Sequence, residues 1–234
     1  MSNLKALFFD IFGTVVDWRT SIAREARDLL KPMGHALDWQ GFADAWRDEY
    51  QPGMEEIRSG KAPFARLDVV HRRNLERILP RFGLTGLDEA TRVNLNLAWH
   101  RLDGWADSAP GLLRLRDKYR LAPVSNGNIS LMCDLARRNS FIWDAILGAE
   151  VAGDYKPKPR VYLSACEAFG FAPADCVMVA AHAGDLKAAK AQGLRTAFIP
   201  RPAEPGPGKG ETTPPDGVDI VAKDMLALAD ALGC

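Results

Sequence analysis

The feature that most constrains this chain is a change of pattern along its 234 residues. The segment Leu4–Phe9 is a short apolar run that ends at Asp10, with Gly13 close behind, which predicts a buried strand followed by a loop. From Ser21 to about Asp103 the apolar residues recur at helical spacing, and no convincing strand interrupts them. The first strand is therefore separated from any partner strand by a long helical segment.

The helical segment predicts four helices. The first two follow the apolar spacing of Ile22, Ala26, Leu29 and Leu30, ended by Pro32 and Gly34, and of Ala43, Trp46 and Tyr50; the others cover Phe64–Leu79 and Asp88–Leu102, with Asp88 as N-cap.

After Pro110 strand-like and helix-like segments alternate. The predicted helices are Leu112–Lys118, Ser130–Arg138, Arg160–Phe169, Asp185–Gln192 and Lys223–Leu232, and the predicted strands are Leu121–Val124, Cys176–Ala181, Thr196–Ile199 and a last one near Asp219–Val221. Such alternation predicts a parallel sheet covered by helices on both faces. We therefore expect an α/β protein with a Rossmann-like core of residues 1–16 and 104–234, and an all-helical cap domain of residues 17–103 inserted over the carboxyl edge of the sheet. The Pro- and Gly-rich segment Pro200–Gly217 predicts an irregular surface loop.

Composition excludes several classes of partner. Lys and Arg number 30, as do Asp and Glu, so the formal net charge is zero, which argues against nucleic acid or an anionic membrane surface as a partner. The apolar runs are shorter than the roughly 20 residues of a membrane span, and Asp10 interrupts any signal-peptide-like run. The four cysteines include no CxxC pair, which argues against a zinc site or a disulfide framework and favours the cytoplasm.

Polar residues follow the predicted strands. Asp10 ends the first strand, Ser125 and Asn126 end the next, and Asp185 comes a short turn after Cys176–Ala181. Lys156 lies in a Pro-rich loop before a helix. Because functional groups of an open parallel sheet gather at the carboxyl ends of its strands, we expect these side chains to converge. An N-cap role for Asp185 in the helix that follows it is compatible with a role in the site.

Several segments in order resemble the haloacid dehalogenase superfamily. They are Phe9-Asp10-Ile-Phe-Gly-Thr14, Val124-Ser125-Asn126-Gly127, Tyr155-Lys156-Pro-Lys-Pro-Arg-Val-Tyr162 and Asp185-Leu-Lys-Ala-Ala. Within the superfamily the chain is similar to the (S)-2-haloacid dehalogenases, also called haloacid dehalogenase type II. The resemblance runs nearly end to end and implies hydrolysis of a small 2-haloacid, with no cofactor.

Two departures from the phosphatases of the same superfamily favour dehalogenation. Those enzymes carry an acid two residues after the nucleophile, where this chain has Phe12, and a Mg²⁺-binding acid four residues before the position of Asp185, where this chain has Ala181. A hard cation needs several oxygen ligands. We therefore expect chemistry without a metal and a leaving group, such as halide, that needs no proton.

The resemblance also implies roles for individual residues. Asp10 attacks C2 of an (S)-2-haloalkanoate and forms an ester, which water hydrolyses to the (R)-2-hydroxy acid. The other implied roles are: Arg47 and Asn126 binding halide, Lys156 holding Asp10 ionised, Asp185 positioning Lys156 and water, Thr14 and Ser125 binding the substrate carboxylate, and Phe12 and Tyr162 lining the substrate pocket.

Two further residues differ from some relatives. His182 stands where some members have asparagine, and we expect it to activate the hydrolytic water, since a neutral imidazole is a suitable base. Gly184 replaces a pocket-wall tryptophan, which leaves the substrate chain length open. A packed, non-catalytic His182 is an equal alternative. For the whole chain, another superfamily hydrolase such as a phosphatase, or a non-catalytic binding protein on the same fold, stays open, as does a homodimer.

Overall fold

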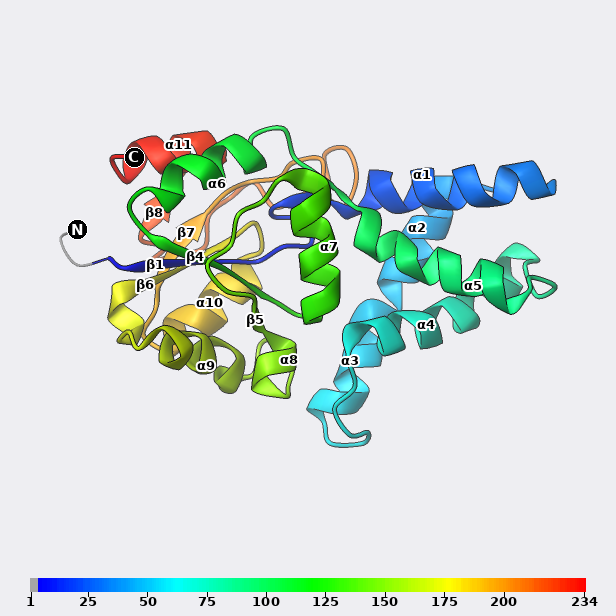
Figure 1. Cartoon of the computed structure of the whole chain (residues 1–234), viewed down its shortest axis with the longest axis horizontal. Coiled ribbons are helices and arrows are strands. Elements are labelled where there is room, and N and C mark those ends of the chain that lie inside the picture. The colour runs from blue at the N-terminus through cyan, green and yellow to red at the C-terminus, as the bar shows by residue number, and fades with distance from the viewer. Residues whose placement is uncertain (1–3) are drawn as a thin grey trace.

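A six-stranded sheet forms the centre of the molecule in the computed structural model, which describes residues 4–234 (Figure 1). Its strands lie in the order β5-β4-β1-β6-β7-β8, and all neighbouring strands pair in parallel. The strands are β1 Ala6–Phe9, β4 Arg120–Ser125, β5 Leu147–Gly148, β6 Cys176–Ala180, β7 Arg195–Phe198 and β8 Ile220–Val221. The predicted Rossmann-like α/β class is confirmed, with the N-terminal strand at the centre of the sheet.

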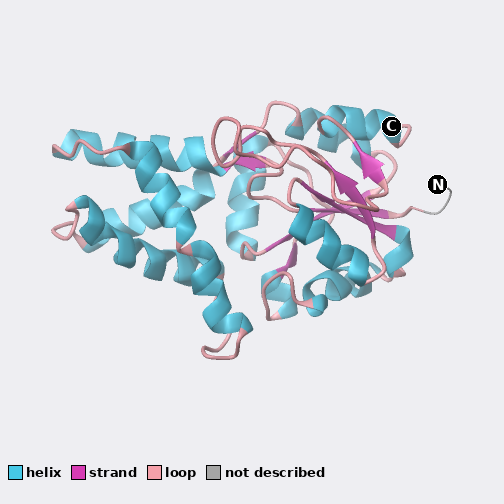
Figure 2. Cartoon of the chain, turned by 180° about the vertical axis from the view of Figure 1, so that it is seen from behind, coloured by secondary structure: helices cyan, strands magenta, loops and turns pink. Residues whose placement is uncertain are grey.

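Helices cover both faces of this sheet (Figures 1 and 2). The period-two alternation of a strand sends Leu7 and Phe9 of β1 into one buried cluster and Ala6 and Phe8 into another. The helices of the sheet-containing body are α6 Ser108–Arg116, α7 Ile129–Asn139, α8 Ala149–Ala152, α9 Pro159–Phe169, α10 Ala183–Ala191 and α11 Met225–Ala231, with a 3₁₀ turn at Pro173–Asp175. Helices α6 and α11 pack with Leu7 and Phe9, and α9 and α10 pack with Ala6 and Phe8.

The remaining helices form a second body beyond the carboxyl ends of the central strands (Figure 1). They are α1 Trp18–Leu30, α2 Trp39–Asp48, α3 Tyr50–Arg58, α4 Leu67–Ile78 and α5 Glu89–Asn96, with 3₁₀ turns at Lys31–Met33, Leu79–Phe82 and Leu97–Arg101. We call residues 18–101 the helical body. The side chain of Asp88 accepts a hydrogen bond from Thr91 N–H at 2.8 Å, so its predicted N-cap role is confirmed. Among the described residues, no helix combines the length and the apolar character that spanning a membrane requires.

The chain crosses between the two bodies at one place. Strand β2, Val16–Asp17, pairs antiparallel with β3, Asp103–Gly104. The carbonyl of Val15 accepts hydrogen bonds from Trp105 N–H at 3.0 Å and from the Ser108 hydroxyl at 2.7 Å. These crossings lie at the predicted boundaries after residues 16 and 103. The division into separate core and cap domains stays a prediction.

Two parts of the secondary-structure prediction are wrong. Tyr50 was expected on one helix with Ala43 and Trp46, but α2 ends at Asp48 and α3 begins at Tyr50. The reason is Pro52, whose ring would clash with the Asp48 carbonyl in a continuous helix, whereas the first turn of a new helix tolerates it. The sequence analysis also missed β5 and α8, which are too short to show a period.

Candidate active site

Asp10 lies directly after β1, the central strand, and its side chain is almost fully buried. Its backbone N–H donates to the Val179 carbonyl of β6 at 3.0 Å, which fixes it at the carboxyl edge of the sheet. The chain then turns at Gly13, where φ is +89° and a Cβ would approach the Glu204 side chain to 2.6 Å. This turn brings the Thr14 hydroxyl back to Asp10, where it donates to Oδ2 at 2.8 Å.

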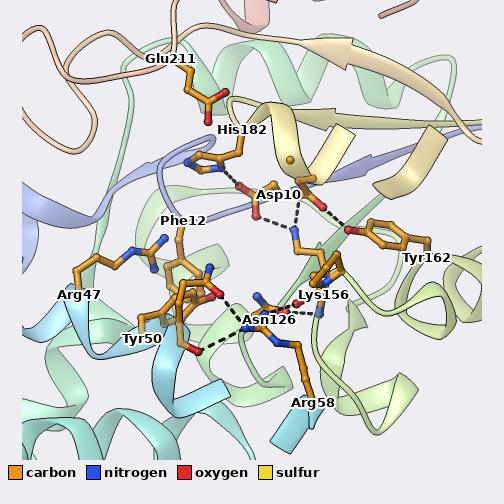
Figure 3. Close-up of a pocket in the computed structure, with 14 residues that line it drawn as sticks. Asp10, Phe12, Arg47, Tyr50, Arg58, Asn126, Lys156, Tyr162, His182 and Glu211 are labelled. Carbon is orange, nitrogen blue, oxygen red and sulfur yellow. Dashed lines mark hydrogen bonds and ion pairs between the residues drawn. The ribbon is translucent and has the colours of Figure 1, made fainter. Parts of the chain in front are cut away.

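Lys156 lies between two buried carboxylates (Figure 3). Its Nζ donates to Asp10 Oδ1 at 2.8 Å and to Asp185 Oδ2 at 2.6 Å. The hydroxyl of Tyr162, on α9, donates to Asp185 Oδ1 at 2.6 Å. The backbone N–H of Lys156 donates to Asn126 Oδ1 at 2.8 Å, which joins this loop to the end of β4. The two acids therefore share one ammonium group in a fixed arrangement.

The charges of this group determine its protonation. Burial alone would raise the pKa of Asp10, but the charge of Lys156 and the hydrogen bond from His182 outweigh it and hold that pKa far below its usual value. Burial would lower the pKa of Lys156, but Asp10 and Asp185 raise it above its usual value. For Asp185 burial prevails over the Lys156 charge, so its pKa is raised. At neutral pH Asp10 is therefore a carboxylate beside a charged lysine.

His182 contacts both Asp10 and Glu204, a carboxylate in the Pro- and Gly-rich loop. Its Nδ1 lies 3.0 Å from Asp10 Oδ2 and its Nε2 lies 3.2 Å from Glu204 Oε2. Glu204 Oε1 in turn accepts from Trp18 Nε1 of the helical body at 2.6 Å. Burial would lower the pKa of His182, but hydrogen bonds to Asp10 and Glu204 and their charges raise it to about 10. His182 is therefore an imidazolium in the resting site.

Asp185 does not occupy the N-cap position that the sequence left open for it. Helix α10 begins at Ala183, so His182 occupies the N-cap position and Asp185 lies within the first turn. Its two carboxylate oxygens accept from Lys156 and Tyr162, as described above, and the α10 N-terminus is instead bound by Glu211, which accepts from Ala183 N–H at 2.8 Å.

Arg47 reaches the site from the helical body. It lies near the end of α2, and its guanidinium carbon lies 4.0 Å from the centre of the Tyr50 ring, 5.2 Å from that of Trp18 and 5.9 Å from that of Phe12. Its Nη1 is buried and has no hydrogen-bond partner among the described residues. A buried cationic donor without a partner has a strong preference for an anion. The geometry thus provides an anion-binding position on the face of the cavity opposite the Lys156 group (Figure 3).

These side chains surround one cavity of about 360 Å³. Its lining residues are Asp10, Phe12, Arg47, Tyr50, Gln51, Arg58, Asn126, Lys156, Pro157, Tyr162, His182, Gly184, Asp185 and Glu211. Most of the residues predicted from the sequence are among them.

The sequence analysis missed the contributions of Tyr50, Gln51, Arg58 and Glu211, and the contact of Glu204 with His182, because these residues lie on helices or in the Pro- and Gly-rich loop rather than at strand ends. For Glu204 and Glu211 the one available signal was a carboxylate within a segment dominated by Pro and Gly.

Thr14 and Ser125 do not line this cavity. Both are fully buried. The Thr14 hydroxyl, besides donating to Asp10, accepts from Ala181 N–H at 2.9 Å, and the Ser125 hydroxyl accepts from Gly127 N–H at 3.1 Å. In this structure the two hydroxyls support the turn after Asp10 and the β4 loop, and their contact with a substrate carboxylate stays a prediction.

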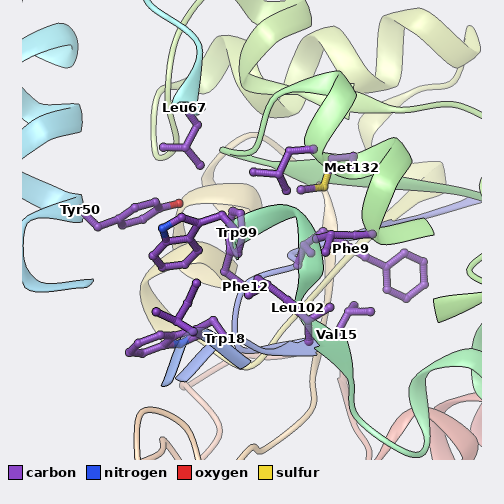
Figure 4. Close-up of a cluster of buried hydrophobic side chains, with 14 of the residues drawn as sticks. Phe9, Phe12, Val15, Trp18, Tyr50, Leu67, Trp99, Leu102 and Met132 are labelled. Atoms are coloured by element: carbon purple, nitrogen blue, oxygen red, sulfur yellow. The ribbon is translucent and has the colours of Figure 1, made fainter. Parts of the chain in front are cut away.

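Phe12 forms part of an apolar wall under the site (Figure 4). Its ring meets Trp99 edge-to-face with 5.8 Å between centroids, and Tyr50 in the same way at 6.2 Å. Phe12 is 2% exposed, so the position two residues after Asp10 brings aromatic surface rather than a proton donor to the site. Such a wall excludes water and strengthens the nearby charge interactions.

The donor set does not fit a divalent cation. A hard cation needs several free oxygen ligands. The carboxylates of Asp10 and Asp185 both accept from Lys156 Nζ, and the position of the further acid is occupied by Ala181. In the described part of the chain no group of three or more His, Cys, Asp or Glu side chains is arranged to hold a metal ion.

The parallel sheet, the helical body above it and the buried aspartate–lysine site together define a hydrolase of the α/β class with a helical insertion. The profile of the haloacid dehalogenase-like hydrolases matches residues 4–193. The chain belongs to this family.

Comparison with individual proteins shows which members of the family this chain is similar to. The structure is similar to that of a defluorinating L-2-haloacid dehalogenase, with a TM-score of 0.96, 43% identity, and 99% of this chain and 96% of that chain covered. A second L-2-haloacid dehalogenase structure matches with a TM-score of 0.95 and 43% identity over 98% and 99% of the two chains. The (S)-2-haloacid dehalogenase 1 of Pseudomonas sp. (strain CBS-3) is 27% identical over 208 residues, which are 88% of each chain. The predicted resemblance to the (S)-2-haloacid dehalogenases is confirmed.

Proposed function

We propose that this protein hydrolyses small (S)-2-haloalkanoic acids to (R)-2-hydroxy acids and halide. One observation carries the proposal: the ionised Asp10 and the unpartnered Arg47 Nη1 line the same cavity, while Phe12 occupies the position of the acid that a phosphatase needs. Displacement of halide needs a nucleophile and an anion acceptor but no proton donor. The names of the two relatives that are 43% identical support the same reaction.

In the first step a carboxylate oxygen of Asp10 attacks C2 of the substrate. The carbon–halogen bond breaks with its electron pair on the halide, C2 is inverted, and an aspartyl ester forms. Arg47 receives the halide with its free N–H, assisted by Asn126. Lys156 keeps Asp10 ionised before the attack.

In the second step water attacks the ester carbonyl carbon of Asp10 and the bond between this carbon and the ester oxygen breaks. The C2–O bond stays intact, so C2 keeps the configuration set in the first step. His182 takes the proton from this water and passes it to the departing oxygen of the hydroxy acid, which restores the Asp10 carboxylate. In the resting site the pKa of His182 is about 10, too high for a base at neutral pH, but the ester removes the negative charge of Asp10. Loss of one of its two anionic partners lowers the pKa of His182 and favours the neutral imidazole. The base therefore becomes available when the intermediate forms.

The substrate carboxylate is assigned to the turns that carry Thr14 and Ser125. Both hydroxyls are hydrogen-bonded within the protein, so we assign the carboxylate to backbone N–H groups of these turns that do not already donate within the protein. Gly184 lines the cavity, and a Cβ added there meets no atom within 4 Å. Substrates longer than chloroacetate therefore have room at this position.

The remaining expectations concern organisation. We propose that residues 17–103 act as a cap domain over the core of residues 1–16 and 104–234, and that the enzyme is a cytoplasmic homodimer. Sedimentation of the purified protein tests the dimer directly.

A substrate panel tests the activity. The purified protein is incubated with (S)-2-chloropropionate, its (R) enantiomer, fluoroacetate and p-nitrophenyl phosphate, each with and without EDTA. Of the two 2-chloropropionate enantiomers, we expect only the (S) form to release halide. This release should be unchanged by EDTA and abolished in Asp10→Asn. Mg²⁺-dependent phosphate release would instead indicate a phosphatase, and no turnover of any substrate would indicate a binding protein. An unchanged rate in His182→Ala, without a trapped ester, would refute the role of His182.

A further inference from the structure

Arg58 separates the active-site cavity from an outer cleft. It is the last residue of α3, and it lines both the cavity and a cleft formed with Gln51, Glu55, Pro157, Lys158 and Pro159, which we call the Arg58 cleft. Its side chain is 11% exposed. In the close-up, Arg58 lies on the side of the cavity opposite His182 and Glu211 (Figure 3).

One hydrogen bond to the sheet-containing body holds Arg58 across this boundary. Its Nη1 donates to the Lys156 backbone carbonyl at 2.8 Å. Within its own helix, Nε donates to Glu55 Oε2 at 2.9 Å and Nη2 to Gln51 Oε1 at 3.1 Å. The bond to the carbonyl is the contact that joins α3 to the loop bearing the catalytic lysine, and its acceptor is neutral.

A second cleft opens on the other side of the cavity but has the opposite charge. This Glu211 cleft shares Arg47 and His182 with the cavity. Its carboxylates belong to Asp44, Asp48, Glu204 and Glu211, and its cations to Arg47, Lys209 and the protonated His182. The charged residues of the Arg58 cleft are Arg58, Lys158 and Glu55, and Glu55 is paired with Arg58. The Arg58 cleft thus carries an excess of positive charge and the Glu211 cleft an excess of negative charge, which favours entry of a small carboxylate through the Arg58 cleft.

We propose that Arg58 is the gate and the first anion-binding residue on the route by which the substrate carboxylate reaches Asp10. The proposal rests on the haloacid specificity proposed above. The incoming carboxylate replaces the Lys156 carbonyl as the acceptor of Arg58 Nη1, because a hydrogen bond to a charged carboxylate is stronger than one to a neutral carbonyl. The same exchange releases α3 from the Lys156 loop and opens the way to the cavity. Arg58 thereby selects acids over neutral molecules of the same size.

The test measures ligand association rather than turnover. In an Asp10→Asn background, which cannot form the ester, the binding rates of (S)-2-chloropropionate and of the uncharged 2-chloropropionamide are followed by stopped-flow tryptophan fluorescence at several ionic strengths. The variants are Arg58→Gln and Arg58→Lys. The matched control is Arg77→Gln, which also removes a cap arginine paired near α3, with Glu56 at 2.8 Å, but lines none of these cavities.

We expect Arg58→Gln to lower the association rate of the acid about tenfold at low salt and to flatten its salt dependence, with the amide unaffected. Arg58→Lys retains most of the rate, and Arg77→Gln matches the parent. An unchanged rate and salt dependence for the acid in Arg58→Gln would overturn the proposal, as would an equal loss for acid and amide, which would indicate a structural effect. If the wild-type enzyme releases no halide, the proposed reaction is refuted. The association rates of acid and amide still decide the role of Arg58, because they do not depend on turnover.

Discussion

The two sides of the active-site cavity differ in how their buried polar groups are satisfied. On the sheet side the charged groups of Asp10, Lys156 and Asp185 are joined by hydrogen bonds of 2.6–2.8 Å. On the helical side Arg47, His71 and Trp99 each carry a buried side-chain nitrogen without a partner. Among the described residues, every buried, unpartnered side-chain nitrogen or oxygen except Ser164 Oγ belongs to the helical body.

This difference separates preorganisation from ligand binding. A fully paired buried group holds the nucleophile in one position and one protonation state before substrate arrives. An unpaired buried donor lowers the stability of the empty protein and is satisfied when an anion or water enters. We infer that the sheet side sets the chemistry and the helical side supplies the response to the leaving group. Four substitutions test this contrast.

The largest effect is expected on the sheet side, from Lys156→Met. It leaves two buried carboxylates without their shared cation, so the free energy of unfolding falls by about 3–5 kcal/mol and halide release is lost. Urea unfolding and a halide assay measure the two effects. Lys5→Met is the control, since it also removes a lysine–aspartate pair, Lys5 with Asp175 at 2.7 Å, but the Lys5 side chain is 43% exposed. That variant loses no more than about 1 kcal/mol, and an equal loss in both would contradict the contrast.

On the helical side, Arg47→Gln is expected to reduce activity strongly with little effect on folding. Without a cationic donor for the departing halide, kcat falls by about 10²–10³. Because Nη1 has no partner to lose, the free energy of unfolding changes by about 1 kcal/mol or less. Single-turnover halide release and urea unfolding measure both. A loss of stability as large as that of Lys156→Met would show that Arg47 is structural.

His182 contacts Glu204, which in turn accepts a hydrogen bond from Trp18 of the helical body, and the effect of this connection between the two sides depends on pH. The pKa of His182 is raised from 6.5 to about 10, so its protonation stabilises the folded state fully below pH 6.5, and this contribution is lost as the pH rises toward 10. Glu204→Gln removes one of the two anions and should lower this pKa by about 1–3 units. The contribution of His182 to stability is then smaller, and its loss is complete at a lower pH. Titration of the His182 ring by NMR, with unfolding from pH 6 to 10, measures the change, and an unaltered pKa would count against the contact.

The smallest effect is expected from His71→Phe, deep in the helical body. Burial holds the pKa of His71 well below its usual value, and its neutral ring stacks on Trp99 with 4.1 Å between centroids. Both ring nitrogens lack a partner, so a phenyl ring there changes the free energy of unfolding by about 1 kcal/mol or less, in the stabilising direction. Activity stays unchanged because His71 does not line the cavity. A loss above about 3 kcal/mol would mean that these nitrogens bind buried water.

Residues at strand ends were the predictable part of the site. Asp10, Asn126, Lys156 and Asp185 could be brought together from sequence because parallel strands present their carboxyl ends at one edge. His182 was singled out for a different reason, because it stands where some relatives have asparagine. Their convergence on one cavity agrees with that expectation.

Residues from helices and irregular loops were not predictable in this way. Arg58 and Tyr50 reach the cavity because α3 starts anew at Tyr50, and helical periodicity alone did not reveal that break. Glu204 lies in the Pro- and Gly-rich segment that predicted a surface loop, yet its side chain is buried against His182. A loop without a period gives no rule for which side chain turns inward, so such a contact depends on the three-dimensional path of the chain.

The sequence by itself determined the α/β core and the helical segment between its first two strands, because local periodicity follows from backbone geometry. The resemblance of its motifs to a known family, rather than periodicity, pointed to Asp10 as the nucleophile. Only the tertiary structure decided the charge state of His182, the unpartnered position of Arg47 and the place of Arg58 between cavity and cleft. Each of these depends on groups far apart in the chain, such as His182 and Asp10, or Arg58 and Lys156. Electrostatic interactions and access routes arise from distances in space, and a sequence pattern does not contain those distances.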